Sequence, residues 1–363
     1  MNNIIRHNWT KEEIISIHSQ PLMDLLHQAS TIHRENHDPN VVQVSTLISV
    51  KTGGCSEDCG YCPQAARYNT GINGNALMSL NEVKTLAEGA KNSGSSRVCM
   101  GAAWRNVNDG DEFDQVLEMV RCINLMDMEV CCTLGMLTEN QAKRLAEAGL
   151  YAYNHNLDSS KDYYKEVIST RSFDDRLKTI ENVRKTNVTV CSGGIIGMGE
   201  TIEDRAGMLV ALSTLNPQPE SVPINALVAV EGTPLEDQSP IKIWDMVRMV
   251  ATTRIIMPHT QVRLSAGRKQ MSQEGQAMCF YAGANSIFSG EKLLTTDNFA
   301  PDDDIEMFNQ LGLKPQKPFV KHPKPNSVLM EESQFKDMNE KPKWSRPKHI
   351  IERNKLAQAK TRN

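Results

Sequence analysis

The sequence predicts a (β/α)8 barrel, a closed ring of eight parallel strands surrounded by helices. Eight short β-rich runs follow one another between residues 44 and 288, and helical patterns lie between them. This stretch has about the 250 residues that such a barrel needs. The cysteine, asparagine and arginine side chains that stand out in the chain fall within these runs or directly after them. A barrel places its chemistry at those positions.

The eight predicted strands are short, apolar and bounded by turn-forming residues. They cover residues 44–50, 97–102, 129–134, 150–156, 189–196, 221–228, 261–266 and 286–288. An open, doubly wound sheet is the alternative arrangement. The glycine-rich run at 193–199 lacks the G-x-G-x-x-G spacing that opens a dinucleotide-binding fold. We therefore favour the barrel.

Four of the helices between these strands begin with a capping signal, in which Ser or Thr is followed three positions later by Glu, Gln or Asp. The signals start at Ser79, Thr138, Ser172 and Thr201. Further helices are expected at 112–126, 158–168, 241–257, 272–282 and 303–311. Two more, at 9–19 and 21–35, precede the first strand, and the second has a proline at its first-turn position.

The chain divides into three predicted parts: an N-terminal helical segment (1–40), the barrel (41–313) and a tail (314–363). The tail carries 13 Lys and Arg against 5 Asp and Glu, and six of the sixteen prolines. We expect this basic, Pro-rich tail to be disordered and to stay outside the core. An RNA-binding arm is the alternative, but we expect no nucleic-acid partner.

Composition excludes several classes of protein. Of the 363 residues, 39% are hydrophobic and 23% are charged, as in ordinary globular proteins. The first fifteen residues lack the apolar segment of a secretory signal, and no apolar run approaches the roughly 20 residues that span a bilayer. We expect a cytoplasmic protein with no membrane partner, whose nine cysteines stay reduced and serve as ligands or core residues.

Three cysteines follow the first predicted strand closely: Cys55, Cys59 and Cys62, in C-x3-C-x2-C spacing. Thiolates are the usual ligands of iron–sulfur clusters, and a four-iron cluster normally takes four of them. Three would leave one iron open to a small molecule. A zinc knuckle is the alternative, but zinc usually takes four ligands from paired C-x2-C units, and the chain has no second pair.

Three further cysteines, Cys99, Cys131 and Cys191, fall on three different predicted strands. One buried cysteine is usually a small apolar residue, but inward side chains from different strands of a barrel meet in layers. Arg263 lies on the seventh strand, and a guanidinium inside a barrel needs an anionic partner. A thiolate-ligated cluster or a carboxylate could be that partner. Cys132 is adjacent to Cys131, and because side chains alternate along a strand only one of the two can face the interior.

Asparagines supply neutral polar groups to the same interior. Asn154 and Asn156 lie two positions apart on the fourth predicted strand and share a face, and Asn225 lies on the sixth. An asparagine offers a donor and an acceptor together, which suits hydroxyl, amide or urea groups better than ions. A structural role for any one of them is equally open.

The cysteine motif, with Tyr61 before its last cysteine, resembles the radical S-adenosylmethionine superfamily. Within that superfamily the chain resembles the biotin synthase family from about residue 10 to residue 313. The strings that carry this resemblance are VKTGGCSEDCGYCPQA, RVCMGAAW, YNHNLD, VCSGGIIGMGET, SVPINALV, VRLSAGR, MCFYAGANSIF and KLLTT.

The resemblance implies a sulfurtransferase that inserts sulfur between C6 and C9 of dethiobiotin to form biotin, the last step of biotin biosynthesis. Its cofactors would be a [4Fe–4S] cluster, S-adenosylmethionine and a [2Fe–2S] cluster from which the sulfur is drawn. A reducing partner such as flavodoxin and a homodimer are also implied. No catalytic acid or base is expected, because radical abstraction of hydrogen from carbon does not need one.

The resemblance also assigns residues. Cys55, Cys59 and Cys62 would hold the [4Fe–4S] cluster, and the [2Fe–2S] cluster would be held by Cys99, Cys131, Cys191 and Arg263. Cys131 matches the ligand position of the family motif, so Cys132 should face the helices. S-adenosylmethionine would contact Tyr61, Ala102, Asn156, Asp158, Arg176 and Ile195. Dethiobiotin would contact Asn156, Asn225, Thr295 and Thr296.

Three other functions fit parts of the pattern. A lipoyl synthase would need a second three-cysteine set before the barrel, and no cysteine precedes Cys55. An electron-transfer or cluster-scaffold protein would not need Asn154, Asn156 and Asn225. An RNA-modifying enzyme would use the basic tail.

Overall fold

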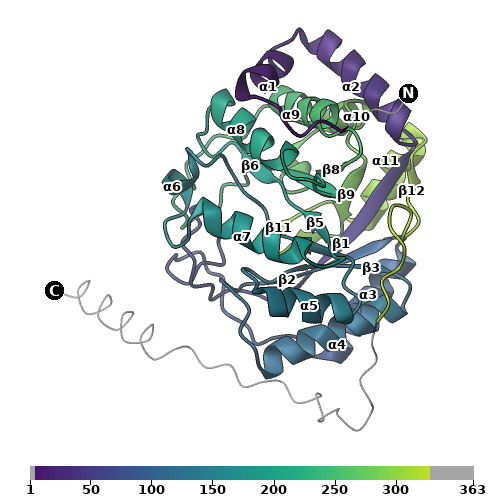
Figure 1. Ribbon diagram of the computed structural model, residues 1–363. Coiled ribbons are helices and arrows are strands. Elements are labelled where there is room, and N and C mark those ends of the chain that lie inside the picture. The colour runs from purple at the N-terminus through teal and green to yellow at the C-terminus, as the bar shows by residue number, and fades with distance from the viewer. Residues whose placement is uncertain (1–4, 328–363) are drawn as a thin grey trace, which may run out of the picture.

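Eight parallel strands close into a barrel in the computed structural model, which describes residues 5–327 (Figure 1). Each strand pairs with the next in chain order, and the last pairs with the first. The predicted fold class is thus confirmed. The barrel strands are β1 (Val41–Lys51), β2 (Arg97–Ala102), β3 (Glu129–Thr133), β4 (Ala152–Asn154), β5 (Thr189–Cys191), β7 (Ser221–Ala226), β8 (Gln261–Leu264) and β9 (Ser286–Ser289).

The fifth predicted strand is broken in two, because the chain turns after β5 and resumes as β6 (Gly194–Ile196). Both pieces pair with β7. At the break, the backbone N–H of Gly193 donates to the Asn156 side chain at 3.1 Å. A Cβ on Gly193 would lie 2.0 Å from the carbonyl oxygen of Pro223, so this close approach requires glycine.

Helices cover the outside of the barrel, and the four predicted capping signals are confirmed by side chains that accept the N–H three residues on. The prediction of a helix at 158–168 is wrong except for one short turn. Asp158 has a φ of 66° and pairs with Gly194, which no helix allows. The helices are α1 (Lys11–His18), α2 (Leu22–Asn36), α3 (Leu80–Asn92), α4 (Asp111–Leu125), α5 (Glu139–Glu147), α6 (Tyr164–Val167), α7 (Phe173–Arg184), α8 (Ile202–Ser213), α9 (Ile243–Ile256), α10 (Gln273–Tyr281) and α11 (Pro301–Leu311).

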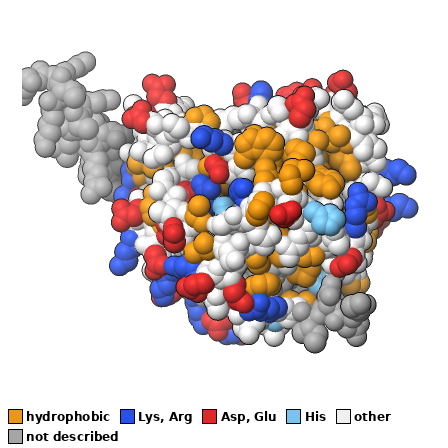
Figure 2. Space-filling view, turned by 90° about the horizontal axis from the view of Figure 1, so that it is seen from above, with side chains coloured by type: hydrophobic (Ala, Val, Ile, Leu, Met, Phe, Trp, Pro, Cys, Tyr) orange, Lys and Arg blue, Asp and Glu red, His pale blue; other side chains and the backbone are white. Residues whose placement is uncertain are grey.

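The two N-terminal helices pack on the outer side of the barrel, α1 against α8 and both against α9. They lie at the top of Figure 1. Seen from above, hydrophobic side chains gather on this face between charged ones (Figure 2). The exposed large side chains on α2, α9 and α10 are those of Met23, Trp244 and Tyr281. Within the described residues, no helix is long and apolar enough to cross a membrane.

The chain after α11 returns to the barrel as β12 (Lys314–Pro315), which pairs with the start of β1. Beyond it, the Phe319 ring packs edge-on against Tyr151, with the ring centroids 5.8 Å apart. The prediction that the tail is disordered from residue 314 on is therefore wrong for 314–327. Composition misled because this segment attaches through backbone pairing, hydrogen bonds and the rings of Phe319 and His322 rather than through many apolar residues. Residues 328–363 lie outside the described residues.

Candidate active site

A cavity of about 310 Å³ opens at the carboxyl ends of the strands. Its wall is formed by the loop after β1, by the ends of β2, β4 and β7, by β6, and by the hairpin of β10 (Lys292–Leu293) and β11 (Thr296–Asp297). Twelve of the predicted site residues line this one cavity. They are Cys55, Cys59, Tyr61, Cys62, Ala102, Asn156, Asp158, Arg176, Ile195, Asn225, Thr295 and Thr296.

The loop with the first three cysteines is folded tightly onto itself. Cys55 donates its backbone N–H to the carbonyl of Gln64 at 3.0 Å, and Cys62 donates to that of Cys59 at 2.9 Å. Burial raises the pKa of Cys59 to about 11 and that of Cys62 to about 12. Burial therefore keeps these thiols protonated, and a metal that binds them would displace their protons. The loop therefore presents three thiols to one cavity in a form suited to a metal cluster.

Asp58 anchors this loop to the chain that follows α6. Its carboxylate accepts the backbone N–H of Ser169 at 2.9 Å and that of Thr170 at 3.1 Å. Carboxylates that accept backbone N–H groups form strong, directional bonds. The position of the cysteines is thereby tied to the rigid rim of the barrel.

A buried polar cluster forms the opposite part of the wall. Tyr61 donates its hydroxyl to Asp158 at 2.6 Å, and Arg176 forms an ion pair with the same carboxylate. Arg176 also donates to the carbonyl oxygen of Asn156 and to the hydroxyl of Tyr164, both at 2.6 Å. An anion that binds Arg176 would share it with Asp158. The cluster offers charge and hydrogen bonds to a polar ligand.

The asparagines differ in how much hydrogen-bonding capacity they leave free. Asn225 donates to the carbonyl of Gly194 at 2.9 Å and accepts the N–H of Ala266 at 3.1 Å, so its amide is already fixed by backbone. Asn154 also lines the cavity, and its buried side-chain oxygen has no partner among the described residues. Buried polar atoms normally find one. Asn154 is thus the acceptor in this wall that is best placed for a ligand.

The second predicted group assembles deeper in the barrel. Cys99 and Cys131 are register partners on β2 and β3, and the Cys131 thiol is hydrogen-bonded to those of Cys99 and Cys191. All three thiols are buried in one cluster with Phe288 and Leu293. Since these last two residues also line the cavity, they form the floor between it and the thiols.

Cys132 belongs instead to the main core of the protein, apart from this thiol cluster. The prediction that Cys131 faces the lumen and Cys132 the helices is therefore confirmed. Alternation along β3 puts the two side chains on opposite faces, and the resemblance to the family indicated that Cys131 is the one in the lumen.

Arg263 completes the deeper group and has only neutral partners. It is fully buried and donates to Ser286 at 2.8 Å, to Gln43 at 2.9 Å and to the sulfur of Cys191 at 3.9 Å. The hydrogen bond with Cys131, followed by the charges of Arg263 and Arg97, lowers the pKa of Cys191 to about 7.

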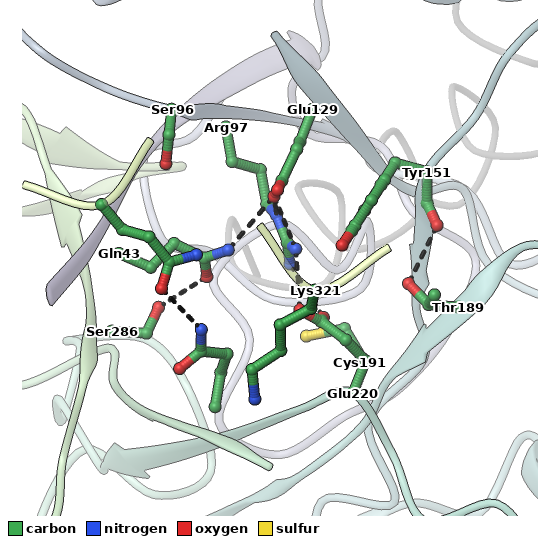
Figure 3. A network of polar contacts seen from close by, with 12 residues as sticks. Gln43, Ser96, Arg97, Glu129, Tyr151, Thr189, Cys191, Glu220, Ser286 and Lys321 are labelled. Atoms are coloured by element: carbon green, nitrogen blue, oxygen red, sulfur yellow. Dashed lines mark hydrogen bonds and ion pairs between the residues drawn. The ribbon is translucent and has the colours of Figure 1, made fainter. Parts of the chain in front are cut away.

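The nearby carboxylates are taken by a different arginine. Arg97 pairs with Glu129 at 2.8 Å and with Glu220 at 3.0 Å, and it lies between them in Figure 3. Among residues 5–327, no carboxylate forms an ion pair with Arg263, so the salt-bridge alternative fails. A buried guanidinium without a counterion is costly. Three thiols and a buried cation with no direct ion-pair partner therefore fit an anionic iron–sulfur cluster.

A single metal ion fits this chain less well than a cluster does. Within the part of the chain that the structure describes, no three His, Cys, Asp or Glu side chains are arranged to hold one ion. An iron–sulfur cluster contains several irons, so its thiolates need not converge on one point. The zinc alternative has no support in this geometry.

Sequence reasoning missed several charged residues around both groups. Glu57 and Arg171 line the cavity, and their side-chain atoms approach to 3.8 Å. The triad of Arg97, Glu129 and Glu220 lies below the thiols. One signal in the sequence could have found the triad, namely a charged residue at or next to the start of three apolar strands. Arg97 and Glu129 are register partners at the first positions of β2 and β3, and Glu220 directly precedes β7.

Comparison with known proteins identifies the family. Residues 49–212 match the Radical SAM superfamily, and residues 223–314 match the Biotin and Thiamin Synthesis associated domain. The biotin synthase of Flavobacterium johnsoniae is 74% identical over 362 residues, a match that covers 100% of both chains. The chain belongs to the biotin synthase family. The mitochondrial biotin synthase of Arabidopsis thaliana is 57% identical over 314 residues, 86% of this chain and 83% of that relative.

Solved structures support the fold of this biotin synthase family member. Methylornithine synthase superposes with a TM-score of 0.71 at 18% identity, over 85% of this chain and 94% of that chain. A maturase of the [FeFe]-hydrogenase superposes with a TM-score of 0.72 at 16% identity, over 85% of this chain and 72% of that chain. Membership of the radical SAM superfamily implies a four-iron cluster and S-adenosylmethionine.

Proposed function

We propose that this chain forms biotin from dethiobiotin by inserting sulfur between C6 and C9. The observation that carries the proposal is the stacking of two thiol sets in one barrel. Cys55, Cys59 and Cys62 line the cavity, while Cys99, Cys131 and Cys191 lie beneath its floor with Arg263. Insertion of sulfur needs a site that activates carbon next to a site that holds sulfur.

The first three cysteines would hold the [4Fe–4S] cluster, and the deeper three with Arg263 would hold a [2Fe–2S] cluster. When bound, the four-iron cluster and S-adenosylmethionine supply radical abstraction of hydrogen from carbon, and the two-iron cluster supplies sulfur. The protein's own residues orient the reactants and exclude water. Phe288 and Leu293 form an apolar floor, so the reacting carbons would be held in a dry part of the cavity.

The cavity wall divides the remaining binding roles. S-adenosylmethionine would lie against Tyr61, Ala102, Asn156, Asp158, Arg176 and Ile195. The Asp158 carboxylate suits ribose hydroxyls, because it accepts from Tyr61 with only one of its oxygens. Dethiobiotin would be held by Asn156, Asn225, Thr295 and Thr296. Asn154 would be a further acceptor for its ureido N–H groups.

The remaining expectations stay predictions. We propose that residues 41–313 form the catalytic barrel and that residues 1–40 pack against it without entering the site. A reductant such as flavodoxin, assembly as a homodimer and a cytoplasmic location are inferred from the family.

The proposal is tested by anaerobic reconstitution of the full chain with iron and sulfide, followed by incubation with dethiobiotin, S-adenosylmethionine and a reductant. We expect 5′-deoxyadenosine and biotin to form together. Formation of 5′-deoxyadenosine without any biotin would keep the superfamily assignment and refute the proposed reaction.

A further inference from the structure

Gln43 is a fully buried glutamine on β1 whose side chain has partners at both ends. Its amide nitrogen donates to Glu129 at 3.1 Å. Its carbonyl oxygen accepts from Arg263 at 2.9 Å and from the hydroxyl of Ser286 at 3.0 Å. Gln43 therefore lies between a buried carboxylate and the guanidinium that faces the thiols. Figure 3 shows Gln43 beside Ser286.

The guanidinium of Arg263 has three nitrogens, and two of them are fixed away from the sulfur atoms. Nε donates to Ser286 and Nη2 donates to Gln43, so Nη1 is left to point at Cys191. A planar guanidinium held at two nitrogens has little freedom to rotate. The direction of Nη1 thus depends on these two hydrogen bonds.

Glu129 is held by partners other than Arg263. One carboxylate oxygen accepts from Arg97 at 2.8 Å and from Gln43, and the other accepts the backbone N–H of Phe319 at 2.7 Å. The C-terminal segment 316–327 thereby helps to hold the Glu129 carboxylate in place. Opposite charges attract strongly in a buried environment. With Gln43 removed, Arg263 and Glu129 would be free to move toward each other.

We propose that Gln43 is a positioning residue for the deeper cluster site. It separates Arg263 from Glu129 and keeps the guanidinium directed at Cys191. The inference rests on the proposed role of Arg263 as a cluster ligand. Gln43 would act through that arginine, because within residues 5–327 its side-chain hydrogen bonds go to Arg263, Glu129 and Ser286 and not to a thiol.

The choice of an uncharged amide follows from this role. A glutamate at position 43 would give Arg263 a carboxylate partner and would place a second negative charge beside Glu129. The neutral glutamine accepts a hydrogen bond from Arg263 and gives it no direct ion-pair partner. That charge is then available to an anionic cluster.

The test compares Gln43→Met with Gln261→Met in the full chain. Methionine keeps the length of the side chain and removes all three of its hydrogen bonds. Gln261 is a matched control, because it is also fully buried at this end of the barrel and bonds Gln316 at 2.9 Å instead of Arg263. Each variant is reconstituted with iron and sulfide, and the two-iron cluster is measured by optical and Mössbauer spectroscopy. The content of the four-iron cluster, which binds elsewhere, reports that the chain has folded.

We expect Gln43→Met to shift the two-iron spectrum in the same direction as Arg263→Met does, by at least half of the shift that Arg263→Met causes. Gln261→Met should keep the wild-type spectrum. In the Arg263→Met background, Gln43→Met should add no further shift. A wild-type spectrum for Gln43→Met, or shifts that simply add in the double variant, would overturn the proposal.

Two further outcomes are told apart by the same set of variants. If Arg263→Met alone leaves the two-iron spectrum unchanged, the assignment of Arg263 as a ligand fails, and the inference about Gln43 fails with it. If Gln43→Met loses the four-iron cluster, Gln43→Leu is measured in its place. Loss of the four-iron cluster in both variants would show that Gln43 supports the fold as a whole, and would overturn the positioning role.

Discussion

The buried triad below the thiols makes a quantitative prediction for Arg97→Met. Arg97 bonds Glu129 through Nε at 2.8 Å and Glu220 through both terminal nitrogens at 3.2 and 3.0 Å. All three side chains are almost completely buried. Removal of one member of a buried ion pair costs about 3–5 kcal/mol, because the remaining charge has no counterion. We expect a loss of about 4 kcal/mol in the free energy of unfolding.

The measurement is urea unfolding of the metal-free chain, monitored by circular dichroism. With a slope near the upper end of the usual range, about 3 kcal/mol per molar urea, the midpoint should fall by roughly 1–1.5 M. Arg144→Met is the control, since Arg144 pairs with the exposed Asp109 and Asp114. Exposed pairs contribute about 0–1 kcal/mol.

Neutralising the carboxylates should reverse much of this loss. In the Arg97→Met background, the substitutions Glu129→Gln and Glu220→Gln remove the two unpaired charges, and we expect them to restore at least half of the stability. A loss below about 1 kcal/mol for Arg97→Met, or no recovery in the triple variant, would refute the reasoning from buried charge.

Two other predictions concern the thiols and the N-terminal helices. Cys131→Ala should abolish the two-iron Mössbauer signal and keep that of the four-iron cluster, whereas Cys132→Ala should keep both; loss of the two-iron signal in Cys132→Ala instead would reverse the assignment on β3. Burial lowers the pKa of His18 to about 4 and that of His33 to about 3. The unfolded chain binds these protons near pH 6.5 and the folded chain does not, so the stabilising contribution is complete above pH 6.5 and is lost as the pH falls. At pH 5, each histidine should lower the free energy that holds α1 and α2 on the barrel by about 2 kcal/mol. Burial also lowers the pKa of His37 at the end of α2. Hydrogen exchange in 11–36 should therefore rise between pH 6.5 and 5 in the wild type and rise less in a His18→Gln, His33→Gln variant; an equal rise in both would contradict the assignment.

The alternation of strands and helices was sufficient to predict the barrel, because each predicted strand carried its own apolar run and turn boundaries. The break at Ser192 and Gly193 was not predictable in this way, since it depends on contacts with Asn156 and Pro223 from neighbouring strands. The docking of 314–327 also escaped composition. Its attachment comes from pairing with β1, from the hydrogen bond of the Phe319 N–H to Glu129, and from the rings of Phe319 and His322 against Tyr151.

The site was predictable where one residue type carries the chemistry. Cysteine spacing predicted a cluster site at Cys55, which lines the cavity. The alternation of side chains along β3 predicted that Cys131 and Cys132 lie on opposite faces, and they belong to different clusters. Gln43 could not be found in this way, because a glutamine in a strand has many possible partners. Its role follows only from the positions of Glu129 and Arg263, which lie 86 and 220 residues away in the chain.

The origin of the inserted sulfur tests the central claim most directly. The wild-type chain and Cys131→Ala are reconstituted with 34S-sulfide, transferred to buffer with unlabelled sulfide, and incubated with dethiobiotin, S-adenosylmethionine and a reductant. The biotin is then analysed by mass spectrometry. If the thiols beneath the cavity hold the sulfur donor, the first wild-type turnover yields 34S-biotin, and Cys131→Ala, which keeps only the four-iron cluster, yields none. Unlabelled biotin from the wild type, or a wild-type yield of 34S-biotin from Cys131→Ala, would contradict it.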